Sequence, residues 1–179
     1  IADLPGIEKR DLSSIDWILQ GAAPMPPPLV HRWADLVGAE RILMAYGMTE
    51  AIGITALRGD EWLAHEGSVG RGQRGTEARI LDEASNDLPT GEIGEIYLRS
   101  PVHGGSDYLG DAPQLRTTED GFQTVGDMGY LDEDGYLYVV DRRVDMIVTG
   151  GANVFPAQVE EALIDHPKIA DVVVVGLKD

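Results

Sequence analysis

Five consecutive residues, Tyr46-Gly47-Met48-Thr49-Glu50, bring together side chains that could act on one ligand. The apolar run Ile42–Ala45 precedes them and is predicted to be a buried strand. An aromatic ring, a hydroxyl and a carboxylate are therefore presented at the end of a strand, where open α/β sheets bind ligands. The ring can stack on a base, the hydroxyl can donate to a phosphate, and the carboxylate can hold Mg²⁺.

Two loops could add to such a site, and each has an ordinary structural alternative. The turn Gly21-Ala22-Ala23-Pro24 has no bulky side chain, so a flat ligand could approach its backbone closely. Its alternative is a plain strand-to-helix connection. Thr124–Asp127 places a carboxylate beside a glycine at the start of a strand, where it could accept hydrogen bonds from a ribose diol. Its alternative is a turn aspartate that bonds its own backbone.

Two further segments carry charge or backbone freedom nearer the C-terminus. Asp141-Arg142-Arg143 places two guanidinium groups together in a very acidic chain. They could bond an anionic or ribose ligand, or they could form an ion pair between domains. Gly150-Gly151-Ala152-Asn153 could close over a ligand or make a tight turn.

The acidic composition limits the partners of this chain. Its 179 residues include 31 acidic and 14 basic ones, for a formal charge of -17. Such a field repels nucleic acid and anionic lipid, so we predict neither as a partner. A nucleotide would need local compensation from Mg²⁺, Arg or backbone N–H groups.

Cysteine usage and hydropathy indicate the compartment. No cysteine is present, which excludes disulfides and thiolate chemistry and agrees with the cytoplasm. The N-terminus lacks the apolar segment of a signal peptide, and the run Val172–Val175 is far too short to span a bilayer. We predict a cytoplasmic protein without membrane insertion. The chain begins at Ile1 rather than Met and ends just after an apolar run, so we expect a fragment of a longer protein.

The first part of the chain has the pattern of a strand, a helix and a strand. Residues 15–19 and residues 41–45 are predicted to form the two strands. The prolines at residues 26–28 suit the first turn of the helix between them, and Gly38 ends it. This order favours a right-handed parallel crossover, and with it a parallel α/β sheet layer.

From about residue 67 the pattern changes to short alternating segments separated by turn residues. The predicted strands are residues 78–81, 95–98, 127–131 and 136–140. The run Asp132–Gly135 between the last two is predicted to close a hairpin. We therefore predict an antiparallel β sheet or small barrel.

A third pattern follows Asp141. It consists of an apolar strand at residues 146–148, a glycine turn, a helix from Pro156 and a buried strand at residues 172–175. The predicted fold class is therefore mixed α/β and α+β. Its parts are a piece of a parallel α/β layer, an antiparallel sheet or small barrel, and the beginning of a small α+β C-terminal domain.

The order of these segments matters more than any one of them. They run as a small-residue loop, Tyr-Gly-x-Thr-Glu, Gly-Glu-x-Gly-Glu, Thr-x-Gly-Asp, Asp-Arg and Gly-Gly-x-Asn-Val-x-Pro. The stretches Tyr136–Arg142 and Asp145–Pro156 are particularly specific, and Gly67–Gly70 and Gly91–Tyr97 agree with them. Over nearly its whole length the chain resembles the adenylate-forming superfamily of acyl-CoA synthetases, peptide-synthetase adenylation domains and luciferases. It is most similar to the acyl- or aryl-CoA ligase branch.

The resemblance implies a division into domains. Residues 1–141 would be the C-terminal portion of the large AMP-binding domain, with an α/β part at 1–66 and a mainly β part at 67–141. Residues 142–144 would be the hinge, and residues 145–179 would start the small mobile C-terminal domain.

The resemblance also implies an activity, that of an acid-thiol ligase of fatty acid metabolism. A carboxylate attacks the α-phosphate of Mg-ATP and releases pyrophosphate, which leaves an acyl-adenylate. A thiol, expected to be CoA, then displaces AMP. The implied cofactors are ATP/AMP, Mg²⁺ and CoA, the substrate partner is a small-molecule carboxylic acid, and a homodimer is possible.

The nucleotide-binding residues implied by the resemblance come from three segments. Tyr46 would stack on adenine, Thr49 would bond the phosphate, and Glu50 would hold Mg²⁺. Thr49 and Glu50 are thus the implied catalytic residues, and Glu50 is the implied metal ligand. Asp127 and Arg142 would bond the ribose hydroxyls. Such a site works mainly by positioning and charge stabilisation.

The other implied site residues are small or unbranched and would border the acyl and CoA groups. They are Gly21, Ala22, Ala23, Gly47, Met48, Gly150 and Gly151. The first three would flank the adenine and the acyl group, and the next two would border the acyl pocket. The glycine pair would line the CoA channel after the small domain rotates about the hinge.

Several departures from the family pattern qualify these expectations. The family's phosphate loop is expected upstream of this chain and its catalytic lysine downstream, so we expect residues 1–179 alone to be inactive. Val144 stands where the hinge is often Asp or Lys, and Ala152 where Glu is common. Two alternatives stay open: a non-catalytic nucleotide-binding or structural module with the same fold, and an adenylation domain that uses another acceptor.

Overall fold

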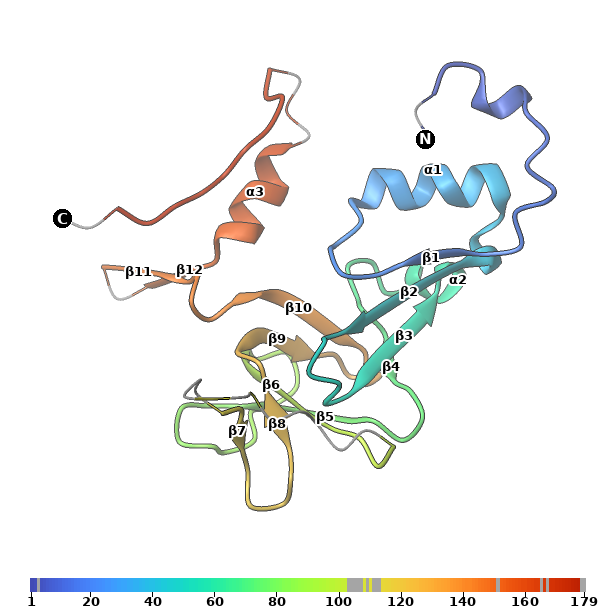
Figure 1. Ribbon diagram of the computed structural model, residues 1–179. Coiled ribbons are helices and arrows are strands. Elements are labelled where there is room, and N and C mark those ends of the chain that lie inside the picture. Colours follow the sequence, from blue (N-terminus) through green and yellow to red (C-terminus); the bar gives the residue numbers. More distant parts are fainter. Residues whose placement is uncertain are drawn as a thin grey trace.

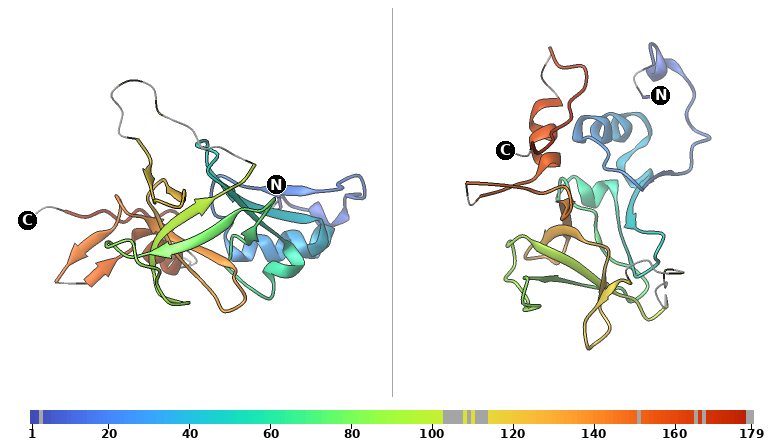
Figure 2. Two further views of the ribbon diagram at one scale, coloured as in Figure 1. Left: turned by 90° about the horizontal axis from the view of Figure 1, so that it is seen from below. Right: turned by 60° about the vertical axis from the view of Figure 1, so that its left-hand side comes forward.

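The computed structural model describes residues 1–2, 4–102, 108, 110, 114–150, 152–164, 166 and 168–177. Two sheets meet near the middle of the molecule, and helices α1 and α3 lie on the same side of the antiparallel sheet (Figures 1 and 2). The N-terminus lies near α1, and the segment at residues 172–177 runs beside α3. None of the helices in the described part of the chain has the length and apolar character needed to cross a bilayer.

The first sheet has four strands in the order β1-β2-β3-β4. They are β1 (Ile18–Gln20), β2 (Ile42–Gly47), β3 (Ile54–Arg58) and β4 (Arg71–Gly72). The predicted parallel crossover is confirmed, because β1 pairs with β2 in parallel. The predicted parallel layer is confirmed for β1 and β2 only, since β2, β3 and β4 pair antiparallel. The sheet is mixed because the turn that contains Thr49 and Glu50 folds β3 directly back onto β2.

Helix α1 (Pro27–Val37) crosses between β1 and β2, as its prolines and Gly38 predicted. Gly38 has a φ of 95°, which favours glycine over residues with a side chain. Val30 and Trp33 on α1 pack against buried Ile42 and Met44 of β2. The remaining short helices are η1 (Ile7–Lys9), η2 (Ala39–Arg41) and α2 (Gly59–Trp62).

Two predicted strand limits differ from the structure. The first strand begins at Ile18 rather than at residue 15, and the second continues through Tyr46 and Gly47. Tyr46 and Gly47 pair with Thr55 and Ile54 of β3, an element that the sequence pattern did not indicate. The aromatic residue of the motif is therefore held by a strand ladder, while Thr49 and Glu50 lie in the following turn.

The second sheet has six strands and is antiparallel throughout. They are β5 (Glu77–Leu81), β6 (Gly94–Arg99), β7 (Arg116–Thr117), β8 (Gln123–Thr124), β9 (Asp127–Leu131) and β10 (Leu137–Arg142). The order is β10-β9-β6-β8-β7, with β5 also on β6, so the described strands form an open sheet rather than a barrel.

The four predicted strands of this region are confirmed as β5, β6, β9 and β10. The hairpin between β9 and β10 is also confirmed. Asp132 accepts hydrogen bonds there from the N–H groups of Asp134 at 3.0 Å and Tyr136 at 2.8 Å. Leu137 links the two sheets, because its N–H and C=O groups bond the backbone of Gly70 and Val69.

The C-terminal region contains a two-stranded hairpin, β11 (Ile147–Thr149) and β12 (Ala152–Val154), and helix α3 (Pro156–Ile164). The predicted strand–turn–helix order is confirmed. The predicted buried strand at residues 172–175 is wrong, since Val173 is 75% and Val175 66% exposed. No described strand pairs with this segment; it bonds α3 through the Val174 N–H and the Glu160 carboxylate at 2.8 Å. An apolar run forms a buried strand only where neighbours cover both its faces.

Candidate functional site

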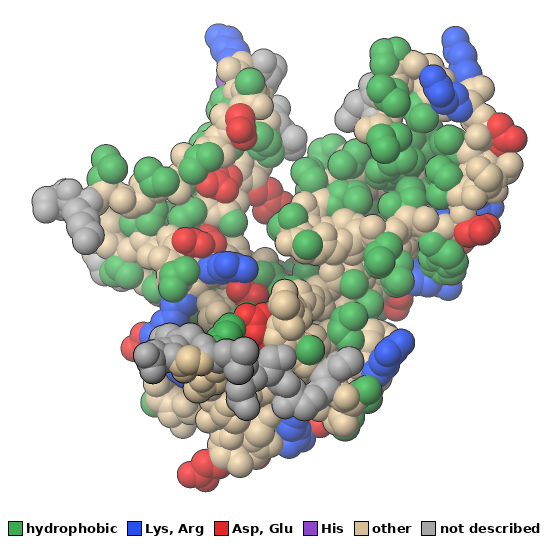
Figure 3. Space-filling model, viewed as in Figure 1, with side chains coloured by type: hydrophobic (Ala, Val, Ile, Leu, Met, Phe, Trp, Pro, Cys, Tyr) green, Lys and Arg blue, Asp and Glu red, His purple; other side chains and the backbone are tan. Residues whose placement is uncertain are grey.

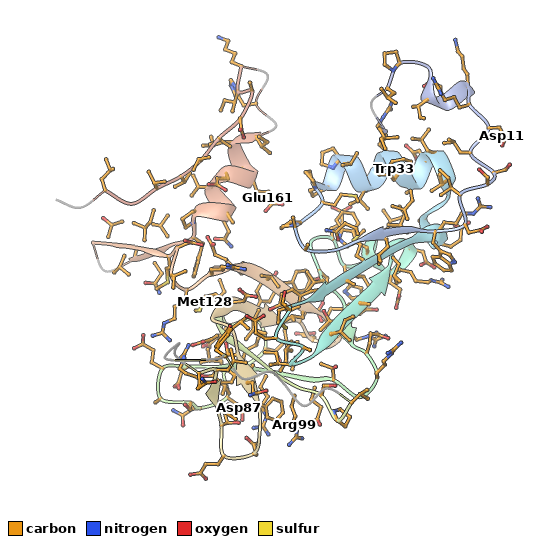
Figure 4. The ribbon with its side chains drawn as sticks, in the orientation of Figure 1. Asp11, Trp33, Asp87, Arg99, Met128 and Glu161 are labelled. Atoms are coloured by element: carbon orange, nitrogen blue, oxygen red, sulfur yellow. The ribbon has the colours of Figure 1, made fainter. Side chains whose placement is uncertain are left out.

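A groove of about 1450 Å³ opens where the end of β2, the loop after β1 and the β9–β10 pair meet. It lies near the base of the hollow between the arm that carries α1 and the arm that carries α3 (Figure 3). In Figure 4, Trp33 on α1 and Glu161 on α3 mark the two arms. A smaller hollow of about 710 Å³ between α3 and the C-terminal tail contains none of the predicted site residues.

Most of the predicted site residues line this groove. They are Ala22, Ala23, Tyr46, Gly47, Met48, Thr49, Glu50, Asp127 and Arg142. Three predicted positions are not among its lining residues. A side chain on Gly21 would meet the Ala45 carbonyl oxygen at 3.4 Å, so Gly21 packs against β2. Gly150 lies in the exposed turn between β11 and β12, and Gly151 is outside the described residues.

Tyr46 and Asp127 join the two sheets across the groove. The Tyr46 hydroxyl donates a hydrogen bond to Asp127 Oδ2 at 2.6 Å. Burial raises the pKa of Tyr46 well above its usual value, and the adjacent Asp127 charge raises it further. The phenol therefore stays protonated and remains a donor. The hydrogen bond fixes the plane of the ring, and with it the surface on which a flat ligand could stack.

A β-bulge places Arg142 opposite Asp127. The β9–β10 register pairs Val139 with Gly129, but then shifts by one residue and pairs Arg142 with Asp127. Without the shift, Asp141 would stand opposite Asp127 and two carboxylates would repel. Bulges commonly re-aim side chains in this way near functional sites. Arg142 Nε lies 3.6 Å from Asp127 Oδ1.

The Asp127–Arg142 pair is asymmetric in its exposure. The Asp127 side chain is 11% exposed, whereas the Arg142 side chain is 72% exposed. A largely solvated ion pair contributes little to stability. The arginine therefore keeps donors that a ligand in the groove could use, while the carboxylate is fixed.

The loop before Asp127 is held by its own hydrogen bonds. Gly126 has a φ of 91°, in the left-handed region that favours glycine. Its N–H donates to Thr124 Oγ1 at 2.9 Å, and its carbonyl oxygen accepts from the Arg143 N–H at 2.8 Å. The prediction that this carboxylate might only bond its own turn does not describe the structure, because Asp127 bonds Tyr46 from another sheet.

The small-residue loop after β1 forms the opposite wall. Ala22 has a φ of 68°, an uncommon conformation for a residue with a Cβ. The Gln20 side-chain amide donates to the Ala23 carbonyl oxygen and ties the loop back to β1. Ala22 and Ala23 are both exposed, so the wall is low and leaves room for a ligand.

Thr49 and Glu50 lie in the turn after β2. Thr49 is exposed, and the Glu50 carboxylate accepts a hydrogen bond from the Tyr108 hydroxyl at 2.5 Å. The described residues contain no cluster of three or more His, Cys, Asp or Glu side chains that could hold a metal. A single carboxylate still suits Mg²⁺, which usually keeps several waters and binds one or two carboxylates together with substrate phosphates.

Sequence reasoning gave no role to a buried carboxylate beneath this site, the last residue of the Gly-Glu-x-Gly-Glu motif. Glu95 on β6 is 4% exposed. It accepts hydrogen bonds from Thr124 Oγ1 at 2.9 Å, from Arg143 Nη1 at 3.0 Å and from Arg116. Burial alone would raise the pKa of Glu95, but Arg116, Thr124 and Arg143 outweigh it and hold this pKa below its usual value. Five consecutive residues of β6 are buried, so no alternation of polar and apolar positions marked Glu95.

The two neighbouring arginines have different partners. Arg143 bonds Glu95 and also the exposed Glu83, at 3.0 Å each, while Arg142 faces Asp127. Both guanidinium groups thus form ion pairs, with carboxylates of the second sheet and of the turns beside it.

Comparison with known proteins identifies the family of this chain. Residues 2–108 match the family described as AMP-binding enzyme. The chain is 40% identical to a 4-coumarate–CoA ligase-like protein of Oryza sativa subsp. japonica, over 96% of this chain and 29% of that protein. It is 40% identical to a 2-succinylbenzoate–CoA ligase of Bacillus cereus, over 93% of this chain and 34% of that protein. The chain thus spans about a third of the length of these relatives.

Solved structures agree with the fold. An amide bond synthetase from Marinactinospora thermotolerans superimposes with a TM-score of 0.87 at 35% identity, over 99% of this chain and 37% of that chain. An o-succinylbenzoate coenzyme A synthetase from Bacillus subtilis, in complex with ATP and magnesium ion, superimposes with a TM-score of 0.78 at 33% identity. That match covers 90% of this chain and 34% of the other.

Proposed function

This chain belongs to the AMP-binding enzyme family, and from that premise we propose that it is part of an ATP-dependent acid-thiol ligase. The complete protein would activate a carboxylic acid as an acyl-adenylate, release pyrophosphate and transfer the acyl group to CoA. One observation supports this most directly. Tyr46, Asp127 and Arg142 converge in a single groove that also contains Thr49 and Glu50.

Asp127 and Arg142 would bind the ribose. Asp127 Oδ2 already accepts a hydrogen bond from Tyr46. Asp127 Oδ1 lies 3.6 Å from Arg142 Nε and has lone pairs that can accept further hydrogen bonds. The two ribose hydroxyls would donate to the carboxylate, and the solvated guanidinium would donate to the same hydroxyls. The Tyr46 ring would carry the adenine, and its hydroxyl would keep the ring and the ribose-binding carboxylate in one fixed arrangement.

Thr49 and Glu50 would act on the phosphates. The exposed Thr49 hydroxyl is free to turn toward a phosphate oxygen as a donor. Glu50 would hold Mg²⁺, which when bound supplies positive charge against the triphosphate. In a chain with a net charge of -17, such compensation is needed because the protein field itself repels ATP.

The acyl substrate and the acceptor follow from the relatives. Both curated relatives are named as CoA ligases of aromatic acids, so an aryl acid is the first candidate substrate and a fatty acid the second. The similarity to an amide bond synthetase favours an alternative in which an amine replaces the thiol. We further propose that residues 1–141 belong to the large domain, 142–144 to the hinge and 145–179 to the small mobile domain.

Pyrophosphate release tests the proposal. The complete polypeptide that contains this chain would be incubated with ATP, Mg²⁺ and a panel of aryl, fatty and steroid acids, first without an acceptor and then with CoA or a simple amine. We expect acid-dependent pyrophosphate release, and a thioester when CoA is added. Nucleotide binding without pyrophosphate release for any acid would instead support the non-catalytic module.

A further inference from the structure

We propose that Glu95 is a positioning residue of the nucleotide site, which sets the spacing of Asp127 and Arg142 through the residues beside them. The proposal rests on the proposed function, since it assigns a role within the same site. It concerns a side chain that does not line the groove, although its three bonded partners Arg116, Thr124 and Arg143 do.

The backbone places Glu95 directly behind the site. Glu95 on β6 pairs with Met128 on β9, the residue that follows Asp127. Figure 4 labels Met128 on the antiparallel sheet, below the arm that carries Glu161. Glu95 is therefore one register position from Asp127 on the neighbouring strand.

Each oxygen of Glu95 holds a different side of the site. Oε1 accepts from Thr124 at 2.9 Å, and Thr124 in turn accepts from the Gly126 N–H just before Asp127. Oε2 accepts from Arg143 at 3.0 Å, and Arg143 follows Arg142 directly. The Arg143 N–H also bonds the Gly126 carbonyl oxygen at 2.8 Å. Two connections from one carboxylate thus meet at the residues flanking the proposed ribose-binding pair.

The charge of Glu95 is essential to this arrangement. A buried carboxylate is retained at low cost only when charged partners surround it, and Arg116 and Arg143 supply that charge. Without the negative charge, Arg143 would keep only Glu83, whose side chain is 87% exposed. An exposed pair of that kind is weak. Arg143 would then leave its position, and Arg142 would move with it.

The test compares Glu95→Gln with Glu83→Gln in the complete polypeptide. The first variant keeps an acceptor for Thr124 but removes the buried charge, whereas the second removes only the exposed partner of Arg143. Binding of AMP and of 2′-deoxy-AMP is measured by calorimetry, and kcat and KM for ATP and 2′-deoxy-ATP by pyrophosphate release. The ratio between the ribo and deoxy nucleotides reports on ribose contacts, which a general loss of stability would not change.

For Glu95→Gln we expect the preference for the ribo nucleotide to fall about tenfold, the effect of a lost hydrogen bond to a charged group. Glu83→Gln should retain the wild-type ratio. Arg143→Gln, which leaves Glu95 paired with Arg116 and Thr124, should reproduce the loss if Glu95→Gln does not fold.

A folded Glu95→Gln or Arg143→Gln protein with the wild-type ratio would overturn the positioning role. If the wild-type protein binds AMP with ribose preference but forms no adenylate, the proposed reaction is refuted, and a fall of that preference in Glu95→Gln still supports the positioning role. A wild-type protein without ribose preference would refute both.

Discussion

Replacing Tyr46 with Phe separates two roles that one side chain combines. The ring, which we expect to carry adenine, is retained. The hydroxyl that bonds Asp127 Oδ2 at 2.6 Å is removed. The change adds no atoms, so it causes no steric conflict between β2 and β9.

The magnitude follows from the bond that is lost. A hydrogen bond to a charged group contributes about 1.5–3 kcal/mol to stability. The Asp127 side chain is 11% exposed, so water can replace the phenol only in part. We therefore expect Tyr46→Phe to lower the free energy of unfolding by about 2 kcal/mol, within that range. Because Asp127 would lose a fixed partner, the KM for ATP should rise while kcat changes less.

Urea denaturation and steady-state kinetics of the complete polypeptide measure both effects. Tyr138→Phe is a matched control, since its hydroxyl bonds Asp132 Oδ2 at 3.2 Å in the β9–β10 hairpin, and Tyr138 does not line the groove. The control should lose some stability and keep the wild-type KM for ATP. The reasoning fails if Tyr46→Phe retains both the stability and the KM of the wild type, or if the control changes KM equally.

Three further predictions use the same site. Asp127→Ala should weaken the use of ATP by about 1–3 kcal/mol, because ribose partners are left unpaired, and an unchanged KM and rate for ATP would contradict that role. The folded pKa of Glu95 is lowered from 4.5, so its ion pairs stabilise the fold above that pH, and their contribution is lost as the pH falls below 4.5 through the folded pKa. The difference in the free energy of unfolding between wild type and Glu95→Gln should therefore shrink from pH 7 to pH 3. Urea denaturation at both pH values would measure it, and a constant difference would contradict a stabilising role of the Glu95 charge. Residues 1–179 alone should release no pyrophosphate with any acid, and measurable release would show that a phosphate loop and a lysine outside these residues, as we expect them, are dispensable.

The elements that could be predicted are those whose start or end is set by a few neighbouring residues. Such signals are the prolines at the start of α1 and α3, the glycine after α1 and the Asp132–Gly135 turn. Strand β3 was not predicted because it follows the Tyr46–Glu50 motif without a strong turn signal. The segment at 172–175 was expected to be a strand because of its apolar run alone, yet a strand also needs a partner.

The candidate site was predictable only in part, and for a physical reason. The order of motifs indicated Tyr46, Asp127 and Arg142, whose side-chain types suit the proposed ligand. Their mutual placement depends on the bulge that pairs Arg142 with Asp127 and on the buried charge of Glu95. The one-residue register shift has no local sequence signature, and the Gly-Glu-x-Gly-Glu motif that contains Glu95 does not reveal which side chains its carboxylate bonds.

The arrangement of charge accounts for the difference between Arg142 and Arg143. The chain carries 14 basic residues against 31 acidic ones, so acidic side chains are available to pair with the basic ones. Arg143 is committed to a carboxylate that is 4% exposed, and this bond restrains the backbone beside it. Arg142 faces Asp127 at 3.6 Å with 72% of its side chain in solvent, a contact weak enough for a ligand to replace. The strongly paired arginine thus holds the strand end, and the weakly paired one is available for the nucleotide that we propose.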